Sequence, residues 1–145
     1  MENMEKSLEY QDFIAIELLK KLGWCINLMT SKRYQIEVGE SICGVEIKND
    51  RNMAKTGNLY IETAERHFTP NFVPSGINRK DNTVFWVIGD YQTAYIFSKD
   101  QLKFMCNNYQ KYGFKTTETE TSKGVLIPIS YFEKVPFYVI RKLYF

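Results

Sequence analysis

Hydrophobic and polar residues alternate along the segment CGVEIKND, residues 43–50, with the two-residue period of a β-strand. Val45 and Ile47 point to one face of this strand, and Glu46 and Lys48 point to the other. Strands of this kind bury their apolar face and turn their charged face to solvent. The segment therefore predicts a half-buried strand with a charged outer face.

The rest of the pattern predicts a mixture of helices and strands. Apolar residues recur at helical spacing over residues 6–22, where two lysines and Gly23 mark the end of an amphipathic helix. Further strands are predicted over residues 24–29, 34–38, 58–63, 84–88, 93–97 and 124–129, and further helices over residues 99–109 and within the tail 131–145. We expect one α/β domain with a central mixed sheet of about five or six strands, flanked by helices.

The charged face of the 43–50 strand is a candidate catalytic site. Glu46 and Lys48 lie side by side, and Glu40 can return to the same edge if the chain bends over residues 41–44. Carboxylate oxygens are the ligands that Mg²⁺ prefers, and the metal activates a bound water. A lysine can orient that water and offset negative charge in the transition state. The cluster therefore suits hydrolysis of a phosphodiester.

A Glu-x-Lys triplet carries little information by itself. With 12 Glu and 14 Lys in 145 residues, about one such triplet is expected by chance. An isolated triplet on an amphipathic strand is more often a solvated ion pair than a catalytic site.

The surrounding sequence resembles the PD-(D/E)xK nuclease superfamily. GESICGVEIKND at residues 39–50 is followed by GNLYIE at residues 57–62, and GVEIK is similar to the matching strand of mismatch-repair nickases and their restriction-enzyme relatives. The longer run through TGNLYIETAER and PSGINRKDNT resembles small phage-encoded proteins of that superfamily, and the resemblance covers about residues 9–97. It implies a restriction-endonuclease-like fold and endonucleolytic cleavage of DNA with Mg²⁺, for which Mn²⁺ substitutes.

The resemblance also implies a role for each residue of the cluster. Glu40 and Glu46 are expected to hold the metal, and Lys48 is expected to be catalytic. The usual first acid is an aspartate, so Glu37 competes with Glu40 for that position. Asp12, on the first helix, is the candidate for a further metal ligand.

Two of these assignments have further alternatives. Glu9 and Glu17 compete with Asp12 for the helix position, and for each of the three acids a solvated helix face is the more ordinary explanation. Glu62 is a candidate supporting residue, because in the simplest hairpin it approaches Glu46 from the neighbouring strand.

Residues 65–82 form the longest irregular stretch, and long loops in compact domains are often functional. Arg79 and Lys80 are candidates for contacts to the backbone of a duplex, and Ser75 could donate its hydroxyl to a phosphate. His67 is the single histidine of the chain and, without a nucleophile motif, is expected to be a structural or surface residue.

Composition bears on how the protein could bind DNA and on its location in the cell. The net charge of +2 is too small for a general polyanion binder, so any DNA contact must be local. Three cysteines without metal-ligand spacing favour a reduced, cytoplasmic location, and no apolar run approaches the length of a membrane span. Small nucleases of this type often act as dimers, so a homodimer is possible.

Two other classes of function compete with the enzyme. The first is a catalytically inactive nuclease-fold protein that binds nucleic acid or a host protein. The second is a phage interaction protein with no nucleic-acid role, which the weak net charge favours. Metal-dependent cleavage and salt-sensitive DNA binding separate the three.

Overall fold

The computed structural model describes residues 2–145. Its helices are α1 (Glu2–Leu22), α2 (Lys32–Glu37), α3 (Met53–Thr56), α4 (Lys99–Asn107), α5 (Tyr109–Tyr112) and α6 (Ile129–Lys134), with the 3-10 turns η1 (Gly76–Asn78) and η2 (Pro136–Tyr138). Its strands are β1 (Val45–Asn49), β2 (Asn58–Glu65), β3 (Val73–Pro74), β4 (Phe85–Gly89), β5 (Thr93–Ser98), β6 (Lys115–Glu118), β7 (Ser122–Pro128) and β8 (Arg141–Tyr144).

Within residues 2–145, no helix has both the length and the apolar character to cross a bilayer.

The strands form two four-stranded sheets, in the orders β1-β4-β5-β8 and β3-β2-β7-β6. In the first sheet β1 runs parallel to β4, while the remaining pairs are antiparallel, as are all pairs of the second sheet. The α/β class is confirmed, and so is a mixed sheet flanked by helices. The expected single central sheet is wrong, because β2 leaves β1 and pairs with β7 instead.

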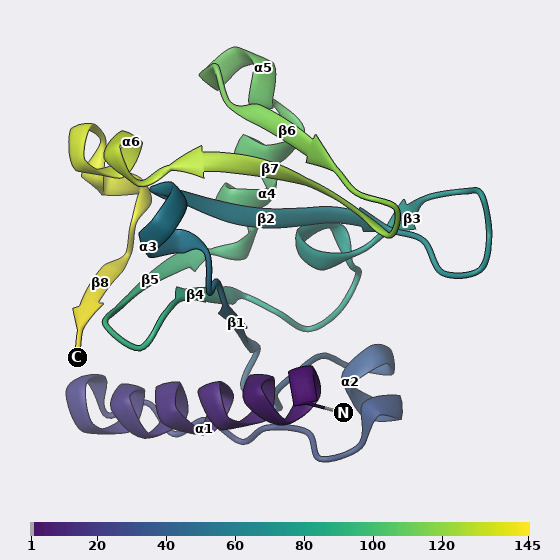
Figure 1. The fold of residues 1–145 in the computed structure, drawn as a ribbon. Coiled ribbons are helices and arrows are strands. Elements are labelled where there is room, and N and C mark those ends of the chain that lie inside the picture. The colour runs from purple at the N-terminus through teal and green to yellow at the C-terminus, as the bar shows by residue number, and fades with distance from the viewer. Residues whose placement is uncertain (1) are drawn as a thin grey trace.

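Figure 1 shows α1 lying along one side of the sheets. Two hydrophobic clusters hold these layers together. Helix α1 covers one face of the first sheet with Tyr10, Ile14 and Leu18, which recur every four residues and are fully buried. Val45 and Ile47 of β1 meet that stripe, as their shared strand face predicts. The opposite face of the first sheet packs against the second sheet and α4. Each fully buried aliphatic side chain of this kind contributes roughly 1.5–3 kcal/mol.

The predicted strands over residues 43–49 and 58–63 are confirmed as β1 and β2, and the predicted hairpin is confirmed as β4 and β5. Three other predictions are wrong. Residues 24–29 form no strand beyond one isolated bridge, and residues 34–38 lie mostly in α2, where Arg33 and Glu37 form an ion pair one turn apart. The predicted final helix near Pro136 is also wrong, because the helix of the tail, α6, ends at Lys134 and the chain continues through η2 into β8, which pairs with β5.

Candidate active site

Glu40 reaches β1 because the chain turns back just before the strand. Ser41 is fully buried, and its hydroxyl accepts a hydrogen bond from the Val45 amide at 2.8 Å and donates to the Val45 carbonyl at 2.7 Å. Gly44 completes the turn at φ 74°, where a Cβ would come within 2.8 Å of the Asn82 carbonyl oxygen. The predicted bend is confirmed, and it places Glu40 beside the strand.

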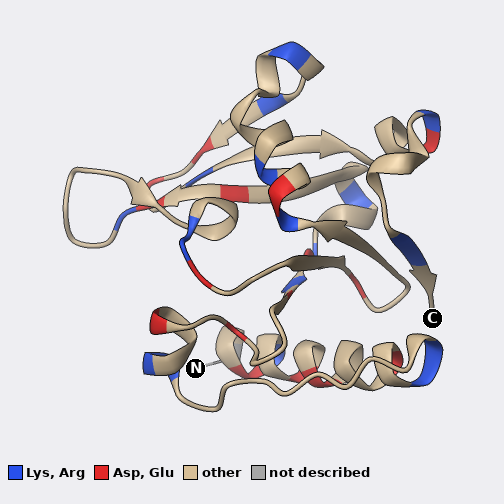
Figure 2. Cartoon of the chain, turned by 180° about the vertical axis from the view of Figure 1, so that it is seen from behind, with Lys and Arg blue, Asp and Glu red and all other residues tan. Residues whose placement is uncertain are grey.

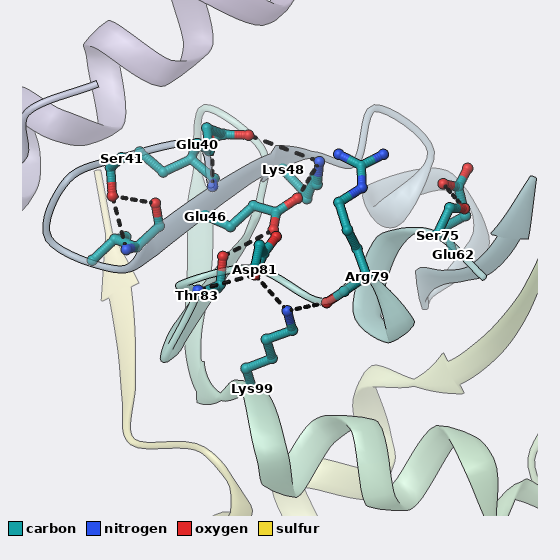
Figure 3. A network of polar contacts seen from close by, with 12 residues as sticks. Glu40, Ser41, Glu46, Lys48, Glu62, Ser75, Arg79, Asp81, Thr83 and Lys99 are labelled. Carbon is teal, nitrogen blue, oxygen red and sulfur yellow. Dashed lines mark hydrogen bonds and ion pairs between the residues drawn. The ribbon is translucent and has the colours of Figure 1, made fainter. Parts of the chain in front are cut away.

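Three charged side chains meet on β1 (Figure 3). Lys48 Nζ lies 2.6 Å from Glu46 Oε1 and 3.8 Å from Glu40 Oε2. The second oxygen of Glu40 accepts a hydrogen bond from the Ile47 amide at 2.8 Å, which fixes the carboxylate against the strand. The structure thus brings Glu40, Glu46 and Lys48 together in one cluster, as their spacing predicts.

The charged face of β1 is covered, which corrects the expectation that it faces solvent. Glu46 is 2% exposed, because β1 places it beside Trp86 of β4 on the face that packs toward the second sheet. Thr83, also buried, donates its hydroxyl to the second oxygen of Glu46 at 3.3 Å. The Lys48 side chain is 39% exposed, so the cluster opens to solvent at its ammonium end.

Burial changes the proton affinities of this cluster. Burial, together with repulsion from Glu46, raises the pKa of Glu40 to about 7, although Lys48, the Ile47 amide and Arg79 act in the opposite direction. Burial lowers the pKa of Lys48, but attraction to Glu46 and Glu40 outweighs it, so this pKa is raised overall. Lys48 therefore stays charged at neutral pH, while Glu40 exchanges its proton near neutrality.

A second ion pair lies beside the first. Lys99 Nζ donates to Asp81 Oδ1 at 2.7 Å and to the Arg79 carbonyl at 2.7 Å. Thr83 connects the two pairs, because its amide donates to Asp81 Oδ1 at 2.9 Å while its hydroxyl reaches Glu46. Burial acts to raise the pKa of Asp81, but the hydrogen bonds from Lys99 and Thr83 lower it overall. Sequence reasoning missed this pair, since no local motif joins residues 18 positions apart.

The three predicted substrate-contacting residues, Arg79, Lys80 and Ser75, differ in how accessible they are in the structure. Arg79 is 34% exposed, and its charge acts to lower the pKa of both Glu40 and Lys48 against the stronger effects that raise them. In Figure 3 its guanidinium lies on the same side of the cluster as the Lys48 ammonium. Lys80 is exposed on the same segment. Ser75 is 1% exposed and donates its hydroxyl to Glu62 at 2.7 Å, so the prediction that it presents this hydroxyl to a phosphate is wrong.

Glu62 does not approach Glu46 from a paired strand, and this prediction is also wrong, because β1 and β2 belong to different sheets. Its two carboxylate oxygens accept hydrogen bonds from the Ser75 hydroxyl at 2.7 Å and the Ser122 hydroxyl at 3.0 Å. Glu62 nevertheless faces the same cavity as Lys48.

Of the two candidates for the first acid, Glu40 lies in the cluster and Glu37 does not. Glu37 lies on the exposed side of α2, and its carboxylate is 3.0 Å from Arg33 Nε. Its side chain is 52% exposed, whereas that of Glu40 is 10% exposed and contacts Lys48.

The acids of α1 do not join the cluster. Asp12 and Glu9 are exposed on the helix, and Glu17 pairs with lysines of its own last turn. Among residues 2–145, no three His, Cys, Asp or Glu side chains form a group able to hold a metal ion. The expected participation of Asp12 as a further ligand therefore has no support, and the buried polar side chain of α1 is Gln11. Acidic residues mark α1 along its length in Figure 2, while basic residues are spread over many elements.

A cavity of about 570 Å³ opens next to Lys48, between the end of β1 and the second sheet. Its lining includes Lys48, Asp50, Tyr60, Glu62 and Trp86. The Asp50 carboxylate accepts a hydrogen bond from the Tyr60 amide at 2.8 Å, which fastens β2 to the end of β1. Lys48 Nζ lies 5.5 Å from the centre of the Trp86 ring, so the indole makes a cation–π contact with the ammonium.

No protein-family model, no curated protein and no solved structure matches this chain. The residues of the cluster and the contacts between them are therefore the basis on which a function can be inferred.

Proposed function

We propose that this protein is a divalent-metal-dependent phosphodiester hydrolase that cleaves DNA endonucleolytically. The supporting observation is the convergence of two buried carboxylates on one ammonium, which also lines a cavity. Lys48 Nζ contacts Glu46 at 2.6 Å and Glu40 at 3.8 Å, and the same lysine lines the cavity. A cavity of this size is within the range of pockets that hold small organic ligands, so it has room for a nucleotide next to the cluster.

The donor set fits Mg²⁺, with Mn²⁺ as a substitute. Magnesium is usually held by one or two carboxylates and takes its other ligands from water and substrate phosphate. Glu40 and Glu46 supply two such carboxylates, which is consistent with the lack of a three-residue metal group among residues 2–145. The raised pKa of Glu40, to about 7, reflects burial and repulsion from Glu46, both of which a bound cation would relieve.

Each residue has a distinct role in the proposed reaction. Glu40 and Glu46 would hold the metal, which when bound lowers the pKa of a coordinated water and stabilises charge on the phosphoryl oxygens. Lys48 carries its proton at neutral pH and orients the attacking water while offsetting negative charge. Arg79, on the open side of the cluster, contacts the substrate phosphate.

The finer fold assignment, restriction-endonuclease-like, belongs to the same proposal. It is supported by the chain order of helix α1, Glu40 and the Glu46-Ile47-Lys48 strand, and by the packing of α1 on β1.

Nicking of supercoiled plasmid tests the proposal. With Mg²⁺ or Mn²⁺ we expect cleavage by the wild type, no cleavage in EDTA, and a loss of at least about 100-fold in Glu46→Gln and Glu40→Gln. Glu37→Gln is the matched control, because Glu37 is an ion-paired glutamate outside the cluster, and this variant should cleave like the wild type. Wild-type activity in Glu46→Gln, or equal losses in Glu40→Gln and Glu37→Gln, would remove the assignment.

One observation favours a second candidate, a nuclease-fold protein that binds nucleic acid without cutting it. The Lys48 ammonium already contacts both carboxylates and so neutralises part of their charge without a metal. This candidate predicts salt-sensitive gel retardation of duplex DNA with no metal-dependent cleavage of plasmid, linear or branched DNA.

A further inference from the structure

The loop between β2 and β3 holds its apolar tip residue away from the protein. The Phe68 side chain is fully exposed, at 107% of its reference area, although phenylalanine usually contributes to a core. Its φ of 59° is unusual, since among residues 2–145 every other residue with a positive φ is glycine. A bulky side chain in this conformation is strained, and such strain is retained mainly at functional sites.

Contacts at the base of the loop fix its shape. Arg66 donates to the Glu120 carbonyl at 2.6 Å and to the Pro70 carbonyl at 3.1 Å, which ties together the two sides of the loop and the neighbouring β6–β7 turn. Two cations cover the Phe72 ring, since Arg66 lies 4.4 Å and Lys123 lies 4.3 Å from its centre. The base of the loop is therefore held by directed contacts, and Phe68 projects from a supported structure.

The loop is linked to the candidate active site through Glu65, the last residue of β2. Glu65 lies 3.6 Å from Arg79, whose charge acts on Glu40 and Lys48, and 3.2 Å from His67. Phe68 follows three residues after Glu65, and an extended chain spans at most about 3.3–3.6 Å per residue. The Cα atoms of Glu65 and Phe68 are thus within about 11 Å, much less than one turn of duplex DNA, about 34 Å. The loop therefore lies close to the Glu65–Arg79 pair, and Arg79 in turn acts on the charges of Glu40 and Lys48.

We propose that Phe68 is a wedge that inserts between stacked base pairs of the duplex DNA bound by the protein. Apolar side chains used in this way unstack a base step and bend the duplex, while neighbouring cations contact its phosphates. Arg66 and Lys123 are the cations at the base of the loop, where both lie over Phe72 and Lys123 is also 3.8 Å from Glu118. The inference rests on the proposed function in taking DNA as the substrate.

The chemistry around Phe68 favours a base stack over other partners. The flanking residues His67 and Thr69 are polar, so one ring projects without the apolar surround that a protein–protein hot spot requires. Stable adsorption to a lipid surface requires a larger apolar face than one side chain. A base step accepts a single flat ring, and the stacking does not depend on sequence.

An introduced indole reports on the insertion. We expect duplex DNA, in Ca²⁺ buffer, to quench the added tryptophan emission of Phe68→Trp, measured against the wild type. Phe137→Trp is the matched control, because Phe137 is 78% exposed on η2, outside the loop, and its emission should not change. Phe68→Ala should bind duplex about 10-fold more weakly, Phe68→Leu should keep most of the affinity, and Phe137→Ala should bind like the wild type.

Each outcome decides between explanations. Equal responses of the two tryptophan variants, duplex binding unaffected by Phe68→Ala, or no duplex binding by the wild type would overturn the wedge. A spectral shift of Phe68→Trp with phosphatidylglycerol vesicles but not with DNA would assign the loop to a lipid surface instead. If DNA quenches Phe68→Trp but no metal-dependent cleavage occurs, the wedge proposal stands and the hydrolase proposal is wrong. If the protein cleaves DNA and Phe68→Ala changes neither cleavage nor binding, the wedge proposal alone is wrong.

Discussion

Two lysine–carboxylate groups lie next to each other in this protein, and they differ in charge balance and in exposure. Lys99 and Asp81 form a one-to-one pair whose side chains are 6% and 2% exposed. Lys48 is shared by two carboxylates, and its side chain is 39% exposed. Thr83 donates hydrogen bonds to an acid of each group.

The comparison shows how the ratio of carboxylates to lysines changes the pKa of a buried carboxylate. In the Lys99–Asp81 pair, which is closed to solvent and is called the closed pair below, hydrogen bonds to Asp81 outweigh burial and lower its pKa. In the group of Glu40, Glu46 and Lys48, which reaches solvent at Lys48 and is called the open group below, burial and a second carboxylate raise the pKa of Glu40 to about 7. One lysine satisfies the first group, whereas the second retains negative charge that a metal ion can neutralise.

The largest expected effect comes from breaking the closed pair. Lys99→Met leaves Asp81 buried without its partner, and removing one member of a buried pair typically costs about 3–5 kcal/mol. Urea denaturation should show a loss of this size. Adding Asp81→Asn to Lys99→Met removes the uncompensated charge and should restore part of the stability, and no recovery in the double variant would contradict this explanation.

Lys48→Met tests the open group. We expect plasmid cleavage to fall by about 100- to 1,000-fold, because the ammonium that offsets transition-state charge is lost. Binding of Mn²⁺, measured by titration calorimetry, should be at least as tight as in the wild type, since the two carboxylates no longer share a lysine. The stability loss should be smaller than that of Lys99→Met, and a variant that unfolds like Lys99→Met would place Lys48 in a structural role.

The raised pKa of Glu40 predicts a pH dependence. Because its folded value, about 7, exceeds its ordinary value of 4.5, the stability linked to this proton is complete below pH 4.5 and disappears as the pH rises through 7. In metal-free buffer the wild type should lose up to about 3 kcal/mol relative to Glu40→Gln over this interval. Denaturation at a series of pH values measures the difference, and a pH-independent difference would refute the assignment.

The smallest expected effect concerns the link between the two groups. Thr83→Val keeps the amide hydrogen bond to Asp81 and removes the hydroxyl that donates to Glu46. We expect a stability loss of about 1 kcal/mol by urea denaturation, the usual contribution of one hydrogen bond. Plasmid cleavage should fall less than in Lys48→Met. Ser122→Ala, which removes a hydroxyl bonded to Glu62 instead, serves as the comparison.

Local sequence patterns were sufficient to predict the part of the candidate site whose residues lie close together in the sequence. Glu40, Glu46 and Lys48 lie within nine consecutive positions, so strand alternation and one bend could predict that they converge. Strand β1 and the β4–β5 hairpin were predictable for the same reason. Their catalytic roles stay a prediction.

The errors concern contacts between distant segments. The alternation that predicted β2 could not reveal its pairing with β7, so Glu62 was placed beside the wrong strand. The partners Asp81 and Lys99 are joined by folding alone, and the burial of Ser75 depends on its bond to Glu62. The tail has apolar spacing that fits a helix, but pairing with β5 turns its last residues into β8.

The parallel pairing of β1 with β4 has a consequence for biosynthesis. Parallel neighbours require a long crossover, and here it runs from residue 50 to residue 84 and contains β2 and η1. A growing chain therefore carries Glu40, Glu46 and Lys48 well before the ribosome adds the strand that encloses them. Until then Glu46 is hydrated, and β1 has no neighbour within its sheet. Incomplete chains should accordingly lack the assembled cluster, which is completed only after most of the domain has been translated.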